Sequence, residues 1–169
     1  MKNRKIVVVA FMLIAAMLMG VGYAALTDTL TLIGNATIDM NQAGNNFDAK
    51  VYFSAAEIIS SPNESVDTVG GVGTDDATFA AHSLATMGDV AVFKFTITNQ
   101  SNVPVEITLP EEATNSSDKF DVSYAYSISN MIIPSKGSMD ITVTVEVIKP
   151  VTSATTATFN VAYTATTVE

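Results

Sequence analysis

Few residues in this chain could perform acid–base or nucleophilic chemistry. The sequence contains a single histidine, His82, and no cysteine. A catalytic zinc ion needs several protein ligands, usually including two histidines at helical spacing, and one histidine without cysteine cannot supply them. A Ser-His-Asp triad would have to use His82, and the chain has no G-x-S-x-G motif. We therefore expect no enzyme activity and no cofactor, and a peptidase is the least favoured hypothesis.

Paired carboxylates are the second candidate, because hard cations bind oxygen ligands. Asp75 with Asp76, and Glu111 with Glu112, are adjacent acids in polar segments. A calcium ion takes about six to eight oxygens, and Asp67, Asp75 and Asp76 could contribute some of them together with backbone carbonyls of the neighbouring glycine-rich segment. The D-x-[DN]-x-[DN]-G spacing is missing. Calcium is therefore kept as the weaker interpretation, and solvated surface charge is the favoured one.

The overall charge limits the partners of this chain. It has eight Lys and Arg residues against 17 Asp and Glu residues, a formal net charge of −9. All the acids but only five of the basic residues lie after Ala24, so a chain cut there would carry −12. Binding to a phosphate backbone or to anionic lipid needs clustered cations. We therefore expect no nucleic-acid partner, and the acidity favours solubility in an exterior medium.

The N-terminus has the layout of a secretory signal peptide. Three basic residues precede an apolar run over 6–21, and the small residues Gly22 and Ala24 then occupy the −3 and −1 positions of a cleavage site. The sequence therefore predicts a signal helix over 1–24, with cleavage between Ala24 and Ala25.

An uncleaved signal anchor is the alternative. Residues 6–26 offer 21 mostly apolar residues, which suffices to cross a ~30 Å hydrocarbon core. The protein would then contact the membrane only through this leader. In both cases we expect an extracellular or cell-surface location. The lack of cysteine is typical of export from a cell that has no disulfide-forming compartment.

Beyond the leader, apolar and polar residues alternate with a period of two, the pattern of a half-buried β-strand. The first apolar row consists of Leu26, Leu30, Leu32, Ala36, Ile38 and Met40. A strand over 26–40 would span about 50 Å, well beyond the usual strand length. Gly34 and Asn35 are therefore predicted to divide it into two pairing segments or to mark a bulge.

The same alternation recurs over 47–53, 91–97, 103–109, 120–128, 139–147 and 157–165. Turn residues separate these segments, which predicts a single all-β domain over 25–169. We expect an antiparallel β-sandwich of the jelly-roll or Ig-like type. Residues 60–78, rich in glycine and acids, predict an exposed loop, and residues 80–85 predict a short helical turn.

Two short motifs lie at the two ends of the first predicted strand, GYAALTD at 22–28 and ATIDM at 36–40. They resemble the opening of the TasA/camelysin family of secreted bacterial matrix proteins. Further on, the sequence over 83–109 is similar to the family's succession of turn, strand, Asn-containing turn and strand. Met87 departs from the pattern, because it stands where the family has proline. The motifs together cover about half the chain.

The resemblance implies a jelly-roll-like sandwich whose copies join into extracellular fibres by donor-strand exchange. In that arrangement the N-terminal strand of one subunit fills a groove in the next. The resemblance assigns the donor-strand role to Leu26, Leu30, Leu32, Ala36, Ile38 and Met40. Camelysin-type relatives are described as metallopeptidases, and the shortage of zinc ligands argues against that activity here.

Burial physics makes a donor strand plausible independently of the resemblance. Six apolar side chains give on the order of 10 kcal/mol of gross burial before ordering costs. A head-to-tail exchange is open-ended and builds filaments. We therefore expect a secreted, self-associating subunit of extracellular matrix (biofilm) fibres or surface filaments.

The alternative function is that of a monomeric surface binding module. In that case the first strand packs into its own sandwich, and a groove or the acidic loop recognises a ligand. Its aromatic contacts would come from Tyr52, Tyr124 and Tyr126.

Overall fold

The computed structural model describes residues 30–40, 51–73, 75–108, 114–150 and 155–168. Eleven strands form two sheets in this part of the chain. The seven-stranded sheet has the order β3 (Thr68–Gly70), β4 (Asp76–Leu84), β1 (Leu30–Met40), β11 (Thr155–Thr167), β6 (Val105–Thr108) and β9 (Ile132–Ile133), with β7 (Thr114–Asn115) also paired to β11. The four-stranded sheet has the order β2 (Val51–Ser60), β5 (Val90–Asn99), β10 (Ser138–Val147) and β8 (Phe120–Tyr126).

The two sheets bury facing rows of apolar side chains. In β5, β10 and β11 every predicted inward residue is buried, namely Ala91, Phe93, Phe95, Ile97, Met139, Ile141, Val143, Val145, Val147, Ala157, Phe159, Val161, Tyr163 and Ala165. The rings of Phe79 in one sheet and Phe93 in the other lie 4.7 Å apart between their centroids. The prediction of an all-β fold is confirmed, and the two packed layers are consistent with a β-sandwich.

The expected helical turn over 80–85 is wrong, because residues 80–84 belong to β4. Ala77, Phe79 and Ala81 alternate as buried residues along the strand. Alanine has little intrinsic preference for β-structure, but β4 pairs with β1 on one side and with β3 on the other. Tertiary pairing therefore decides the conformation here.

The predicted loop over 60–78 contains a strand as well as turns. Residues 68–70 form β3, which pairs with β4 and ends the sheet. Gly71 follows with φ of 84°, and a side chain at this position would overlap the backbone of Asp76 and Ala77. The glycines of this segment thus allow a close return of the chain onto β4.

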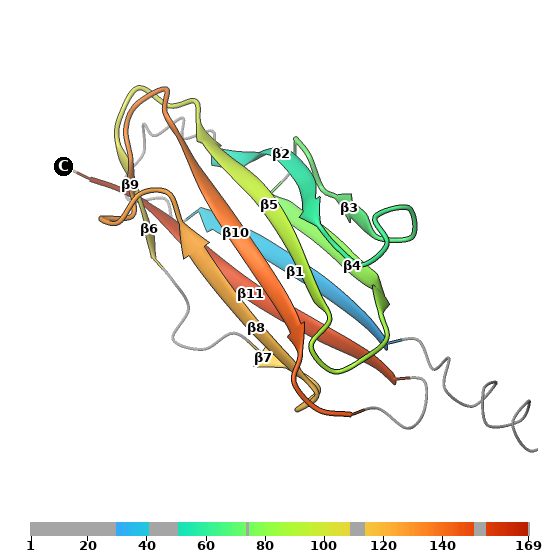
Figure 1. The fold of residues 1–169 in the computed structure, drawn as a ribbon. Helices are drawn as coiled ribbons and strands as arrows, with labels where there is room; N and C mark the ends of the chain where they lie inside the picture. The colour runs from blue at the N-terminus through green and yellow to red at the C-terminus, as the bar shows by residue number, and fades with distance from the viewer. Residues whose placement is uncertain (1–29, 41–50, 74, 109–113, 151–154, 169) are drawn as a thin grey trace, which may run out of the picture.

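One strand pair departs from the expected antiparallel arrangement. β1 runs parallel to β11, whereas the other pairings of the described residues are antiparallel. Parallel pairing joins segments that are far apart in sequence, and here it brings the first and last described strands side by side (Figure 1).

The predicted signal helix, with Ala24 and Ala25 at its cleavage site, lies outside the described residues, as does Leu26. Within the part of the chain that is described, no helix has the length and apolar character needed to cross a membrane.

Candidate functional site

The predicted donor strand lies in the middle of its own sheet. Figure 1 shows β1 between β4 and β11. On the β11 side the register is continuous from Leu30, paired with Thr155, to Met40, paired with Ala165. On the β4 side it runs from Leu30, paired with Leu84, to Thr37, paired with Asp76. Both edges of β1 are therefore occupied within one chain.

The described inward positions of β1 are Gly34 and Ala36. Gly34 and Ala36 are buried, while Ile33 is 45% exposed. The backbones of the donor-strand positions Leu30, Leu32, Ala36, Ile38 and Met40 pair on the β11 side with the row Thr155, Ala157, Val161, Tyr163 and Ala165, of which all but Thr155 are buried. The side chains of Leu30, Leu32, Ile38 and Met40 lie outside the described part. The space that β1 fills is thus bordered by the inward rows of β4 and β11, and this space is called the groove.

Gly34 has a packing role rather than the predicted role of a bulge or a break. β1 is one continuous strand through Gly34 and Asn35, and the irregularity of its register with β4 lies between Leu30 and Leu32. Gly34 pairs with Phe79 of β4, whose ring covers the space that a side chain at Gly34 would fill. The strand needs glycine here because of this neighbour.

The β4 side of the groove is stabilised by hydrogen bonds that do not involve β1. The buried carboxylate of Asp67 accepts hydrogen bonds from the backbone N–H groups of His82 (2.6 Å) and Ser83 (2.8 Å) and from the Ser83 hydroxyl (2.6 Å). These contacts fasten the segment before β3 onto the end of β4. Of the three carboxylates considered for calcium, that of Asp67 is therefore engaged in hydrogen bonds inside the protein.

The turn from β4 into β5 carries a second acid of this kind. The carboxylate of Asp89 accepts hydrogen bonds from the N–H groups of Ala85 and Thr86, both at 2.8 Å, and from the Thr86 hydroxyl at 2.9 Å. Partial burial of Asp89 acts to raise its pKa, but the three hydrogen bonds outweigh burial and the net pKa is lowered. The ionised form of Asp89 therefore stabilises the turn that joins the two sheets.

The β11 wall is also supported away from β1. β6 and β7 pair with the opposite edge of β11. The Ser116 N–H donates to the carbonyl oxygen of Thr158 in β11 at 3.0 Å, and the Thr158 N–H donates to the Ser116 hydroxyl at 2.8 Å. Both walls therefore keep partners that do not involve β1.

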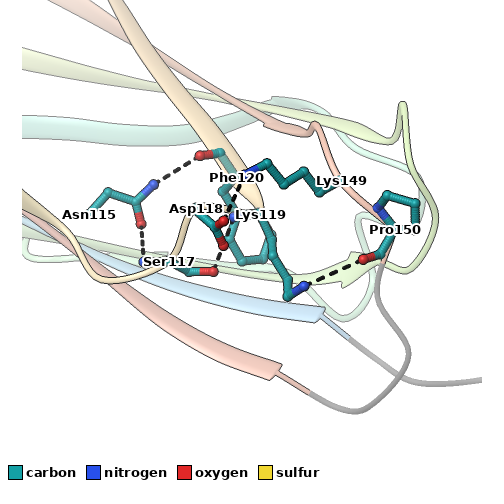
Figure 2. A network of polar contacts seen from close by, with 7 residues as sticks. All are labelled: Asn115, Ser117, Asp118, Lys119, Phe120, Lys149 and Pro150. Atoms are coloured by element: carbon teal, nitrogen blue, oxygen red, sulfur yellow. Dashed lines mark hydrogen bonds and ion pairs between the residues drawn. The ribbon is translucent and has the colours of Figure 1, made fainter.

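Figure 2 shows how the turn after β7 is closed. The Asn115 amide donates to the carbonyl oxygen of Phe120 at 3.0 Å, and its oxygen accepts from the N–H of Ser117 at 3.1 Å. Asp118 is paired with Lys149 at 2.7 Å, which ties the turn to the segment after β10. The end of β7 is thus joined to the start of β8 and to the segment after β10.

The other residues considered for chemistry are dispersed. Among the described residues, no group of three or more His, Cys, Asp or Glu side chains could hold a metal ion. Tyr124 and Tyr126 lie 5.5 Å apart between ring centroids and pack, half-buried, against the core. The Tyr52 hydroxyl accepts a hydrogen bond from Gln100 at 2.6 Å. The three tyrosines therefore form no single exposed aromatic surface.

The alternation of apolar and polar residues predicted β1 but not its neighbour β4. The alternation of Ala77, Phe79 and Ala81 was the available signal, and the surrounding alanines obscured it. Comparisons of this chain with protein-family models, with curated proteins and with solved structures found no match.

Proposed function

We propose that this chain is a secreted structural subunit of extracellular fibres, which assembles when β1 of one copy occupies the groove between β4 and β11 of the next. The proposal includes cleavage after Ala24 and a jelly-roll-like arrangement of the sandwich. It rests on one observation: β1 is the central strand of its sheet, and each neighbouring strand is held by other partners.

The chain connectivity allows β1 to leave the sheet without unthreading. Residues 41–50 join β1 to β2, and with the leader removed only residues 25–29 would precede it. A strand at a chain end with a single connection can be exchanged like the swapped element of a domain-swapped dimer. A strand threaded between two others by connections at both ends could not.

The free energy of exchange is small because β1 makes the same contacts within one copy and between two copies. The groove of a second copy offers β1 the same ladder and the same apolar rows, so burial on the order of 10 kcal/mol gross is lost in one copy and regained in the other. The intramolecular arrangement is favoured at low protein concentration, because the tether gives a high effective concentration. Assembly should therefore depend on concentration, and its head-to-tail form makes it open-ended.

Engineered cysteines test this proposal directly, because the chain has none of its own. Asn35 of β1 pairs with Thr78 of β4, a separation suited to a disulfide once both are Cys. Mature chains carrying Asn35→Cys are mixed with chains carrying Thr78→Cys under mild oxidation. Exchange predicts covalent dimers on gel electrophoresis, and unsubstituted mature chains should form filaments visible by electron microscopy.

Two controls make the result specific. Asn35→Cys mixed with His82→Cys, four residues further along β4, should give few dimers, since these positions are out of register. The double variant Asn35→Cys/Thr78→Cys should close its disulfide within one chain when dilute. If the double variant closes but the mixture yields only monomers at every concentration tried, β1 stays in its own sheet and the monomeric binding module becomes the better hypothesis.

A further inference from the structure

The inner face of β1 has no side chain at Gly34. Gly34 pairs with Phe79 on the β4 side and with Phe159 on the β11 side. A methyl group at Gly34 would overlap the Phe79 ring, while the next inward position, Ala36, carries its methyl group beside Ala77. The groove is therefore narrowed by an aromatic ring at one position along the strand.

The Phe79 ring cannot move aside easily, because it is held by other rings. Its centroid lies 4.7 Å from that of Phe93, 6.1 Å from that of Phe95 and 6.4 Å from that of Phe159. Strands two apart in a sheet are separated by about 9 to 10 Å. The 6.4 Å between Phe79 and Phe159 thus means that the two rings lean toward each other across Gly34.

We propose that Phe79 sets the register of the exchanged strand and restricts the groove to a strand that has glycine opposite it, which for this chain is β1 of a second copy. This inference rests on the proposed function. A slip of β1 by two residues keeps its apolar face inward but places Leu32 or Ala36 opposite Phe79, where a side chain does not fit. The ring therefore selects against other registers and against strands that have a side chain at this position.

Complementary substitutions test the pair Gly34 and Phe79 between two chains. The donor carries Gly34→Ala, Phe79→Leu and Asn35→Cys, so that its own groove accepts its own strand. It is offered to two acceptors with Thr78→Cys, one with Phe79 and one with Phe79→Leu. We expect at least about tenfold slower cross-linking to the acceptor that keeps Phe79, as for overpacking of a held core by a methyl group. Cross-linking to the acceptor with Phe79→Leu should come within about twofold of the reference pair Asn35→Cys and Thr78→Cys.

The outcomes separate this inference from the proposed function. Equal cross-linking of the donor to both acceptors would overturn the role of Phe79 while leaving exchange intact. No cross-linking in the reference pair would overturn exchange and, with it, the role of Phe79 in partner choice.

Thermal unfolding of the unmixed chains provides a second measurement. Gly34→Ala alone should lower the melting temperature, and adding Phe79→Leu should recover part of the loss. An unchanged melting temperature for Gly34→Ala, or a double variant that is no more stable than Gly34→Ala alone, would show that the ring and the glycine are not complementary.

Discussion

Two aspartates with different surroundings show how single residues hold this fold. Asp67 is buried and Asp89 lies in a turn, but each carboxylate accepts two backbone N–H groups and one hydroxyl. Hydrogen bonds to an ionised acceptor are stronger than those between neutral groups. Acids in this chain are therefore not only solvated charge, since these two bind backbone N–H groups at and just after the C-terminal end of β4.

The lowered pKa of Asp89 predicts a specific acid sensitivity. The folded-state pKa lies below the ordinary value of 3.8, so the ionised group stabilises the fold above that value and the contribution is lost as pH falls through the folded-state pKa. Urea unfolding of residues 25–169 and of the same chain with Asp89→Asn, between pH 6 and 2.5, measures this loss. The difference in unfolding free energy should shrink below about pH 4. A difference that stays constant with pH would mean that the charge of Asp89 contributes nothing.

At the scale of elements, the proposed exchange requires that the strands beside β1 have other partners in the sheet. β4 has β3 on its far side, and β11 has β6 and β7. The Asp67 contacts hold the segment before β3 against β4, so they support the wall opposite β11. In the proposed exchange, these hydrogen bonds should hold β4 in place after β1 leaves its own sheet.

Asp67→Ala should therefore loosen β4 more than the rest of the sheet. It leaves two backbone N–H groups without their acceptor, which costs about 3 kcal/mol of unfolding free energy. Hydrogen exchange followed by mass spectrometry should show faster exchange in residues 76–84 than in β5 or β10. Asp67→Asn keeps an acceptor oxygen and should lose less. If the alanine variant changes stability by less than about 0.5 kcal/mol, the hydrogen bonds do not support the wall.

The charge of the whole molecule should control how readily copies associate. After cleavage at Ala24 the chain would carry −12, so approaching subunits repel one another. The Debye length falls from about 10 Å at 0.1 M salt to about 3 Å at 1 M. Light scattering should therefore show faster assembly at 1 M than at 0.05 M sodium chloride. Slower assembly at high salt would instead indicate contacts between opposite charges of neighbouring subunits.

The sequence by itself determined which residues face the core in most strands. Alternation with a period of two places side chains on opposite faces whatever the strand order, so the rows of β5, β10 and β11 could be identified without knowing their neighbours. It also identified β1 as an amphipathic strand. Periodicity failed at β4, where alanine is common and the pattern is weak.

Only the tertiary structure decided what lies beside each strand. Register between segments far apart in sequence depends on packing across the sheet, and no local pattern specifies that β1 lies parallel to β11. Gly34 illustrates the difference. The sequence predicts that Gly34 interrupts a long strand. In the fold, Gly34 lies within a continuous strand, and its lack of a side chain leaves room for the Phe79 ring.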